Sequence, residues 1–254
     1  MNGPPRLELG ADGVARLTLQ RPQHLNRLHR QDLVALQRQL AQVARDTTVR
    51  VLVLTGSGRA FCAGYHLGEL RDDGVDAGPQ SFERVADALA ALPQPTVARL
   101  NGGVYGGATD LALACDFRVG VQGMELRMPA ARLGLHYYAG GLQRAVARLG
   151  LRAARRLFLL AETLDDRALQ QLGYLDACVA PEALDGAVQG LVDALCAGAP
   201  LALQGMKASL NEIAAGDPDA ARIRAREALC AASDDLREGL AAFAAKRAPL
   251  FQGR

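Results

Sequence analysis

Residues 51–66 read VLVLTGSGRAFCAGYH, and residues 96–110 read TVARLNGGVYGGATD. Each segment begins with an apolar run that predicts a buried strand, and each passes through a turn of small residues into the expected first turn of a helix. The run of 51–55 has no alternating polar face, which indicates a sheet covered on both sides. Such junctions point backbone N–H groups outward at the positive end of a helix dipole. Two of these groups facing one point would stabilise an oxygen atom that becomes negative during a reaction.

The sequence around these two segments alternates strands and helices. Residues 14–20 place apolar and polar side chains in turn, which predicts a half-exposed strand. Residues 31–45 carry leucine and valine at helical spacing, and residues 81–92 form a second expected helix that ends before two prolines. The cycle continues through residues 96–121. We therefore predict an α/β core.

From about residue 181 onward the pattern is almost purely helical. Four helices rich in alanine and leucine are expected, over residues 184–197, 201–215, 220–231 and 234–246. Helices of this kind cannot bury their apolar faces alone, so they must pack on the core or on another subunit. We divide the chain into a core of residues 1–195 and a helical region of residues 196–254.

Composition excludes several classes of partner. With 29 basic and 27 acidic residues the formal net charge is +2, which gives no reason to expect nucleic acid or an anionic membrane. The five cysteines show no Cys-x-x-Cys spacing and no pair of histidines has the spacing of metal ligands, so we expect free thiols and no metal. No apolar stretch reaches membrane-spanning length, and residues 1–5 lack the order of a secretory signal. These features predict a soluble, cytoplasmic protein.

The two glycine segments together resemble the signature of the crotonase (enoyl-CoA hydratase/isomerase) superfamily. Further stretches resemble that family in the same order along the chain, namely residues 21–26, 129–135, 140–144, 172–179 and 243–251. The resemblance implies a spiral of ββα turns followed by a C-terminal helical region. It also implies a homotrimer or homohexamer, with residues 196–254 as the oligomerisation region.

The family's chemistry assigns roles to the glycine segments. Its enzymes form an enolate from an acyl-CoA thioester, and two backbone amides hold the negative oxygen. Matched by position, these amides belong to Tyr65 and Gly107. The alternative is that both segments are only close-packed strand-to-helix turns. Asp110 lies three residues after Gly107 on the same expected helical turn, where the family usually has a catalytic glutamate. Aspartate reaches less far than glutamate, and its alternative role is to stabilise the start of the helix.

The second carboxylate of family hydratases is missing. It would fall just after Pro129, where this chain has Ala130. Glu125 lies five residues earlier, which is well over about 10 Å away on an extended segment. Since an alanine can neither activate water nor carry a proton, the sequence argues against an ordinary two-carboxylate hydratase.

The cluster of residues 136–138, His-Tyr-Tyr, resembles the decarboxylating branch of the family, of which methylmalonyl-CoA decarboxylase is an example. A catalytic Tyr137 would orient the leaving carboxylate through its hydroxyl; the alternative is a buried tyrosine whose hydroxyl is satisfied structurally. His66 occupies a place where the family commonly has aspartate, and it either titrates near neutral pH or packs against the turn. His24 and His29 are assigned no role.

Coenzyme A is expected as part of the substrate, with no separate cofactor. The resemblance places the adenine near the backbone of Cys62 and Ala63, and the phosphates near Arg27 and Arg59, each of which is alternatively a solvated surface charge. Phe243 and Lys246 match positions that in the family reach the coenzyme A of a neighbouring subunit.

These features predict an enzyme of the enoyl-CoA hydratase/isomerase family that acts on an acyl-CoA thioester through an enolate held in an oxyanion hole. The missing carboxylate favours an isomerase- or lyase-type reaction. The alternatives are an acyl-CoA decarboxylase of the methylmalonyl-CoA type and a family member that binds acyl-CoA without turnover.

Overall fold

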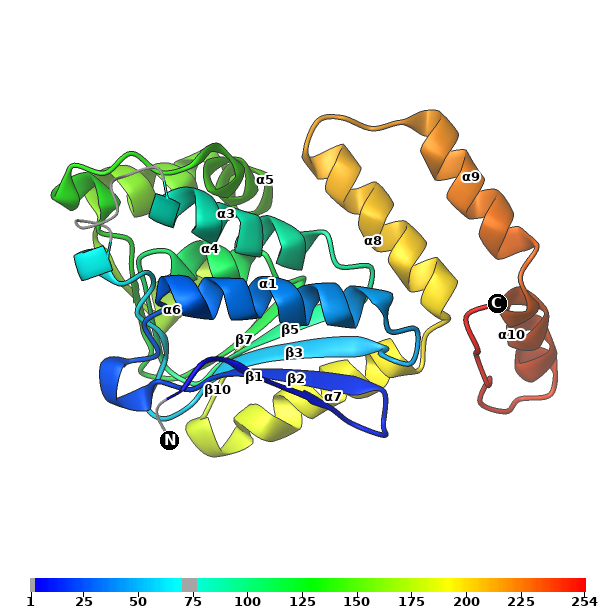
Figure 1. Ribbon diagram of the computed structural model, residues 1–254. Helices are drawn as coiled ribbons and strands as arrows, with labels where there is room; N and C mark the ends of the chain where they lie inside the picture. Colours follow the sequence, from blue (N-terminus) through cyan, green and yellow to red (C-terminus); the bar gives the residue numbers. More distant parts are fainter. Residues whose placement is uncertain (1–2, 70–76) are drawn as a thin grey trace.

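The computed structural model describes residues 3–69 and 77–254 (Figure 1). The strands are β1 (Arg6–Leu9), β2 (Val14–Leu19), β3 (Val51–Gly56), β4 (Ala60–Cys62), β5 (Thr96–Leu100), β6 (Gly103–Tyr105), β7 (Phe117–Val121), β8 (Glu125–Arg127), β9 (Thr163–Asp165) and β10 (Ala177–Val179). The α-helices are α1 (Arg30–Arg45), α3 (Ala77–Ala90), α4 (Ala108–Leu113), α5 (Ala139–Arg155), α6 (Asp166–Gln171), α7 (Leu184–Cys196), α8 (Pro200–Ala214), α9 (Ala220–Ala231) and α10 (Asp234–Ala244). Short helical turns are η1 (Pro22–His24), η2 (Ala130–Leu133), η3 (Arg156–Leu160) and η4 (Pro181–Ala183).

Within the described residues the strands form two sheets. The larger has the order β1-β2-β3-β5-β7-β10, parallel except for the β1–β2 pair, and the smaller has the order β4-β6-β8-β9. From β3 to β8, successive strands alternate between the two sheets, and α3 and α4 follow the pairs β3–β4 and β5–β6. The predicted α/β class and the spiral of ββα turns are confirmed.

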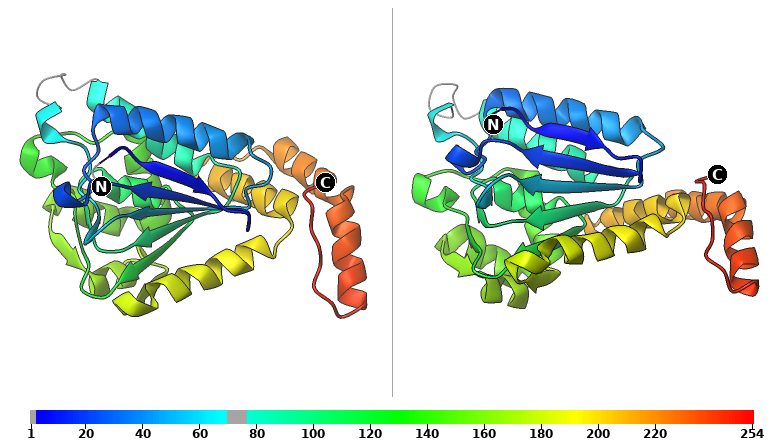
Figure 2. Two further views of the ribbon diagram at one scale, coloured as in Figure 1. Left: turned by 60° about the horizontal axis from the view of Figure 1, so that its bottom comes forward. Right: turned by 90° about the horizontal axis from the view of Figure 1, so that it is seen from below.

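Helices cover both faces of the larger sheet. In Figures 1 and 2, α1 and α3 lie on one face and α7 lies on the other. All but one residue of β3 are buried, as its continuous apolar run predicts. The buried side of α1 carries Leu33, Leu36, Leu40 and Val43, which is the apolar stripe expected from the sequence.

Two of the differences between the observed and the predicted helix bounds have local reasons. The helix α8 begins at Pro200 rather than at the following leucine, because proline is well suited to the first helical position, where its missing N–H costs nothing. The helix α10 ends at Ala244 rather than continuing to Lys246, whose φ of 50° is left-handed and cannot extend a right-handed helix. The helix expected over residues 81–92 spans Ala77–Ala90.

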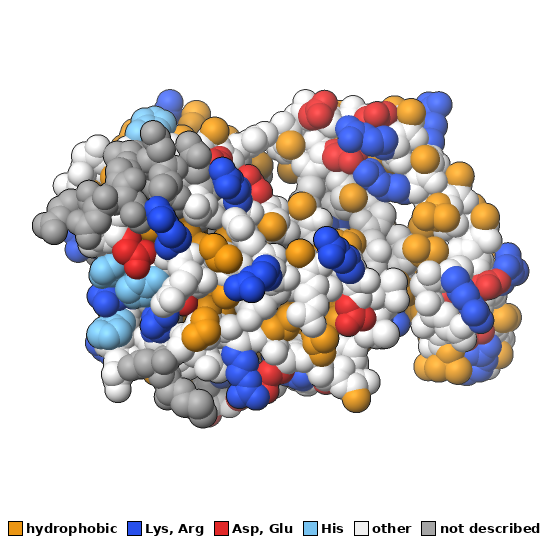
Figure 3. Space-filling view, viewed as in Figure 1, with side chains coloured by type: hydrophobic (Ala, Val, Ile, Leu, Met, Phe, Trp, Pro, Cys, Tyr) orange, Lys and Arg blue, Asp and Glu red, His pale blue; other side chains and the backbone are white. Residues whose placement is uncertain are grey.

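The helices α8, α9 and α10 form an arm beside the core (Figures 1 and 2). A buried ion pair between Lys207 Nζ and Asp116 Oδ2, 2.7 Å apart, ties α8 to the loop before β7. Figure 3 shows hydrophobic side chains among the charged ones on the arm. The large apolar side chains that the arm exposes are Met206, Leu210, Ile213, Leu229, Leu236, Leu240 and Phe243. The division at residue 196 and the oligomerisation role of the arm stay predictions.

Within the described part of the chain, no single helix has the length and apolar character needed to cross a membrane. Only the pair formed by residues 181–196 and 200–214, bent by 106°, meets those criteria when its two helices are taken together.

Candidate active site

Gly64 marks the place where the two glycine loops touch. Its φ is +80°, and a Cβ atom built there would lie 2.8 Å from the carbonyl oxygen of Tyr105 and 2.9 Å from the backbone nitrogen of Gly107. Contacts this short are essentially never made by a real Cβ atom. The loop after β4 and the loop after β6 therefore approach each other closely enough to exclude any side chain between them.

The pairing of β4 with β6 explains why these loops meet. The two strands are parallel neighbours, with Ala60 opposite Gly103, so their carboxyl ends lie at the same edge of the smaller sheet. Gly106 follows with a φ of +56°, and Gly107 is the residue directly before α4. The ring of Phe82 fills the space where a Gly107 side chain would begin, at 2.8 Å from the hypothetical Cβ.

Backbone bonds fix the direction of the Tyr65 amide. Leu28 N donates to Gly64 O at 2.8 Å, and His66 N donates to Leu28 O at 2.9 Å, which makes a parallel bridge between Leu28 and Tyr65. In such a ladder the N–H of the middle residue points away from the partner strand. The Tyr65 amide therefore points away from Leu28.

A cavity of about 150 Å³ lies against the two loops. Its wall is mostly apolar and includes Ala63, Tyr65, Leu67, Phe82, Tyr105, Gly106, Gly107, Met128, Pro129, Ala130, Leu133, Leu135, His136, Tyr137 and Tyr138. None of the described residues that line it carries a carboxylate. The polar side chains that reach its wall are those of four tyrosines and one histidine.

Two stacked tyrosines connect the cavity to Asp110. Tyr137 Oη lies 3.0 Å from Tyr138 Oη, and Tyr138 Oη lies 2.7 Å from Asp110 Oδ2. An ionised carboxylate can only accept, so Tyr138 donates to Asp110 and accepts from Tyr137. Burial, and then the charge of Asp110, raise the pKa of Tyr137 well above its usual value. Burial and the neighbouring Tyr137 and Asp110 likewise raise the pKa of Tyr138. Both hydroxyls are therefore neutral.

The carboxylate of Asp110 does not line the cavity. It is buried, with an exposed fraction of 1%, and Arg144 of α5 binds both of its oxygens, at 2.8 Å from Nε to Oδ1 and 2.7 Å from Nη2 to Oδ2. Arg144 also pairs with Asp87 at 2.7 Å. Burial opposes the charge of Arg144, but its bonds to Asp110 outweigh this and raise its pKa. The sequence predicted that the Asp110 carboxylate faces the same cavity as the Gly107 amide. In the structure the carboxylate lies behind the cavity wall and is connected to the cavity by its hydrogen bond with Tyr138.

Sequence reasoning missed the contributions of Tyr138 and Arg144. Both were present in the family landmarks, but the sequence does not show which of two adjacent tyrosines turns toward α4. It also does not show that α5 packs so that Arg144 meets Asp110. These facts depend on the packing of α5 against α4.

The position of the absent second carboxylate lies in the cavity wall. Ala130 begins η2, is buried and lines the cavity. Glu125 instead bonds to the hydroxyl of Tyr105 at 2.9 Å and does not line the cavity. The structure offers no replacement carboxylate there among the described residues.

The residues expected to bind coenzyme A are only partly brought together. Ala63 lines the cavity, whereas Cys62 is fully buried and its thiol donates to Asn26 O at 3.1 Å, so any contact of Cys62 with a ligand would be through its backbone. Arg27 is half-buried with no hydrogen-bond partner for Nε among the described residues, and Arg59 is exposed.

Phe243 and Lys246 lie elsewhere, on the arm. Phe243 is 87% exposed, Lys246 is exposed just after α10, and neither lines the cavity. Figure 1 shows α10 at the end of the molecule opposite α6. Within one chain, these two residues do not join the candidate site.

The family model described as enoyl-CoA hydratase/isomerase matches residues 10–254. The chain belongs to this family. It is 34% identical over 249 residues to the 2,3-dehydroadipyl-CoA hydratase of Escherichia coli, covering 95% of this chain and 96% of that protein. It is 33% identical over 251 residues to the 1,2-epoxyphenylacetyl-CoA isomerase of the same organism, with 95% and 96% covered.

Solved structures agree with this assignment. The enoyl-CoA hydratase from Bacillus anthracis superimposes with a TM-score of 0.91 at 26% identity, covering 99% of this chain and 100% of that one. The relatives of this family member thus include proteins named as hydratases and as isomerases. Family membership therefore leaves both hydration and isomerisation open, and the choice between them rests on the site.

Proposed function

We propose that this member of the enoyl-CoA hydratase/isomerase family is an isomerase- or lyase-type enzyme that forms an enolate from an acyl-CoA thioester. The observation that carries the proposal is the cavity wall: two converging glycine loops with no carboxylate among the described lining residues. Enolate formation needs an oxyanion site and one route for a proton. Hydration by two carboxylates needs a second acid/base group, which Ala130 does not supply.

The thioester carbonyl would sit against the junction of the two loops. The amides of Tyr65 and Gly107 would donate to its oxygen as the negative charge develops. Each such donor is worth roughly 3 kcal/mol of transition-state stabilisation, because it is held in place before the reaction begins. The contact between Gly64 and Gly107 supports this arrangement, since it brings the two donor loops within one contact distance.

The proton would travel along the tyrosine chain. When the C–H bond of the substrate breaks, its electron pair enters the enolate and its proton goes to Tyr137 Oη. Tyr137 passes its own proton to Tyr138, and Tyr138 passes its proton to Asp110, which becomes a neutral carboxylic acid. The observed hydrogen bonds already run in that direction. Arg144 binds both oxygens of Asp110, which keeps the carboxyl group in place beside Tyr138 as the proton arrives and leaves.

Return of the proton to a different carbon completes a double-bond isomerisation with one base. No water is consumed and no second carboxylate is required. A reaction that consumes no water suits this mostly apolar wall, whose described residues carry no carboxylate.

Decarboxylation is the second candidate, because the same wall would disfavour a charged carboxylate of a malonyl-type thioester. The C–C bond would break to release CO₂, its electron pair would form the enolate, and a proton would then be added at the α-carbon. In this reaction Tyr137 would orient the leaving group. The wall contains no lysine or arginine among its described residues, so no such cation there would pair with the carboxylate.

The proposal is tested by four parallel incubations of the purified protein. They use a 3-enoyl-CoA, crotonyl-CoA, methylmalonyl-CoA, and butyryl-CoA in D₂O, each followed by mass spectrometry. We expect conversion of the 3-enoyl thioester to its conjugated isomer and deuterium exchange into butyryl-CoA. Loss of CO₂ from methylmalonyl-CoA, without isomerisation, would identify the decarboxylase instead.

Rapid hydration of crotonyl-CoA would contradict the proposal and would require an acid/base group in place of Ala130. Tight binding of the thioesters with no deuterium exchange would indicate a family member that binds acyl-CoA without turnover. The variant Ala130→Glu tests the role of the missing second carboxylate directly. We expect it to raise the rate of hydration relative to the rate of isomerisation.

A further inference from the structure

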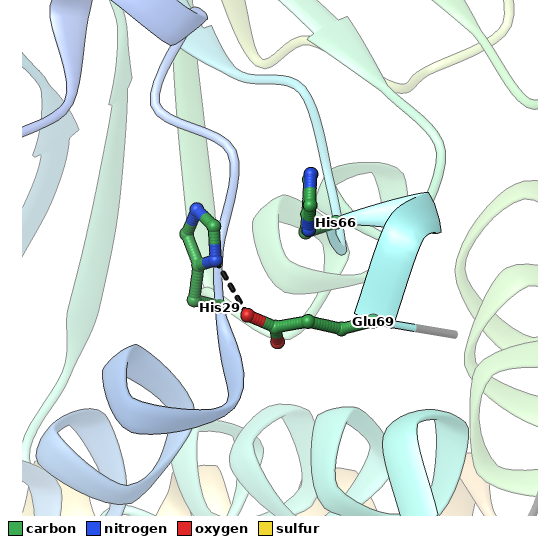
Figure 4. Close-up of side chains that lie close together, drawn as sticks. All are labelled: His29, His66 and Glu69. Atoms are coloured by element: carbon green, nitrogen blue, oxygen red, sulfur yellow. Dashed lines mark hydrogen bonds and ion pairs between the residues drawn. The ribbon is translucent and has the colours of Figure 1, made fainter. Parts of the chain in front are cut away.

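Two histidines and a glutamate meet beside the candidate active site, outside the proposed reaction path. Figure 4 shows His29, His66 and Glu69 turned toward one another. One ligand atom of each lies within 4.8 Å of the other two, and His29 Nδ1 lies 2.6 Å from Glu69 Oε1. The imidazole rings are stacked, with centroids 4.6 Å apart and planes inclined by 30°. All three residues are half-buried.

Backbone hydrogen bonds fix the positions of the three residues. His29 is the residue before α1, and His66 follows the bridge in which its N–H donates to Leu28 O at 2.9 Å. This bond places the two histidine backbones on neighbouring strands. The second carboxylate oxygen of Glu69 accepts from the backbone N–H of Arg30 at 2.8 Å, which fixes the carboxylate beside His29. Hydrogen bonds of this kind orient the ligands of metal sites.

We propose that His29, His66 and Glu69 bind a divalent transition metal, with Zn²⁺ as the best match to the donor set. Two imidazoles and one carboxylate are ligands that Zn²⁺ takes in sites that keep one open position. Around a tetrahedral zinc ion, donors at about 2.0–2.1 Å from the metal lie about 3.4 Å apart. The observed donor atoms lie within 4.8 Å of one another, and the His29–Glu69 pair at 2.6 Å would have to open as a metal enters between them.

Sequence spacing gave no sign of this site. His29 and His66 lie on different segments, and local motifs join ligands that are only a few residues apart. The parallel bridge between Leu28 and Tyr65, a tertiary contact, brings them together.

Metal binding would add a link between two segments that the backbone bridge and the Glu69 carboxylate already hold together. It would link the start of α1 to the turn that carries Tyr65, directly before His66. The metal would therefore stiffen the position of the Tyr65 amide. The site itself depends only on the three donors, so it exists whether or not the proposed reaction is correct.

The test is titration of the full-length, metal-free protein with Co²⁺, followed by displacement with Zn²⁺. We expect one equivalent of Co²⁺ to bind with the visible absorption of a four- or five-coordinate ion. Thiolate-to-cobalt charge transfer in the near ultraviolet should be absent, because the cysteines take no part. Zn²⁺ should displace the cobalt and raise the Tm of the protein by mass action.

Three variants decide the assignment. His29→Asn keeps a good helix-capping residue, and His66→Asn and Glu69→Gln remove the other donors. Each is expected to weaken Co²⁺ binding at least tenfold and to abolish the Zn²⁺-dependent rise in Tm. His136→Asn is the matched control, because His136 lies outside the cluster, and it should bind Co²⁺ like the parent protein.

Absence of Co²⁺ binding in the parent protein would overturn the proposal, as would equal binding by the parent and all three donor variants. A charge-transfer band would overturn it too, by assigning the metal to cysteines. Circular dichroism of each variant checks that the fold is retained, and a variant that fails to fold leaves the other two to decide.

Discussion

Gly64 has to remain a glycine for two separate reasons. Its φ of +80° is costly for any residue with a Cβ atom, and such an atom would press on Gly107 N at 2.9 Å. We expect Gly64→Ala to lose about 1 kcal/mol or more of unfolding free energy and at least a hundredfold in kcat/KM, since displacing one oxyanion donor costs that much. Urea unfolding and thioester turnover measure the two effects.

Gly123 provides the matched control for that substitution. Its φ is +78°, and a Cβ atom there would meet nothing within 4 Å. Gly123→Ala should lose a similar amount of stability from the backbone alone and keep its turnover. Equal turnover by the Gly64 and Gly123 variants would contradict the assignment of the oxyanion loops.

Tyr138 tests the proton route. Tyr138→Phe removes the hydroxyl that links Tyr137 to Asp110, while Arg144 still binds the Asp110 carboxylate. We expect kcat and deuterium exchange to fall by about 10²-fold, the usual size of a general acid–base contribution, with little change in thioester binding.

Tyr174→Phe is the comparison, because Tyr174 is also buried and loses one hydrogen bond, from Oη to Thr109 O at 3.0 Å, outside the cavity wall. It should lose stability and keep its exchange rate. A Tyr138 variant that exchanges at the parent rate would remove the tyrosine chain from the mechanism.

At the residue scale, the sequence indicated the glycines and Asp110 but not the environment of Asp110. Glycines at strand-to-helix turns can be recognised from the sequence, because the turn itself requires them. The ion pair with Arg144 is not visible, since it joins residues 34 positions apart through the packing of two helices. The proximity of His29 and His66 likewise could not be read from the sequence, because it depends on tertiary contacts.

At the scale of the elements, the side chain of Lys207 ties α8 to the core. It is largely buried, with 9% of the side chain exposed, donates to Gln94 O at 2.8 Å and pairs with Asp116 at 2.7 Å. Burial lowers the pKa of Lys207, and Asp116 partly restores it. We expect Lys207→Met to cost about 3 kcal/mol of unfolding free energy, because it leaves the Asp116 charge without its partner.

Lys246, the other lysine of the chain, is exposed, and Lys246→Met should leave urea unfolding unchanged. If the two methionine variants unfold at the same urea concentration, α8 is held by apolar contacts and not by this ion pair.

The elements themselves were largely predictable, and the reason differs by type. Helices after residue 181 have apolar periodicity and proline breaks, so α7, α8 and α9 begin and end within one residue of the expected bounds. The strands β4, β6 and β8 have three residues each, too short for an alternating pattern to show. Alternation alone gave an α/β core, and the spiral that places these strands in a second sheet came from the family resemblance.

At the scale of the whole molecule, buried thiols make stability fall at alkaline pH. Burial raises the pKa of Cys62 and of Cys115 from 9.0 to about 12. Above pH 9 the unfolded chain releases these protons while the folded protein keeps them, so stability is complete below pH 9 and declines toward pH 12. Urea unfolding at a series of pH values should show this decline.

Cys115→Ala should make the decline shallower, because it removes one of the two thiols whose proton is held more tightly in the folded protein than in the unfolded chain. Cys230→Ala, a half-buried cysteine of the arm, is the control. An unfolding free energy that stays constant up to pH 11 would contradict this account.

The arm predicts assembly. Leu229 and Leu240 are 56% and 64% exposed, and a chain with so much uncovered apolar surface is expected to bury it against other copies. We expect light scattering to give about 80 kDa, three times the 26.8 kDa chain, or twice that for a hexamer. The variant Leu229→Glu/Leu240→Glu should shift the mass toward the monomer.

An exposed pair of leucines on the core, Leu159 and Leu160, serves as the comparison, and glutamate there should leave the mass unchanged. A monomeric parent protein would refute the assembly. It would also leave Phe243 and Lys246 without a neighbouring coenzyme A to reach.

The parallel pairing of β4 with β6 also bears on how such a protein diversifies. Neighbouring strands lie about 4.8 Å apart, so the spacing of the two expected oxyanion amides is inherited from the sheet and not from either loop's side chains. Ala130 and Tyr137 come from later segments that take no part in this pairing. Substitutions at Ala130 or Tyr137 can therefore change the chemistry of the cavity wall while the β4–β6 pairing, and with it the spacing of the two proposed oxyanion amides, stays the same.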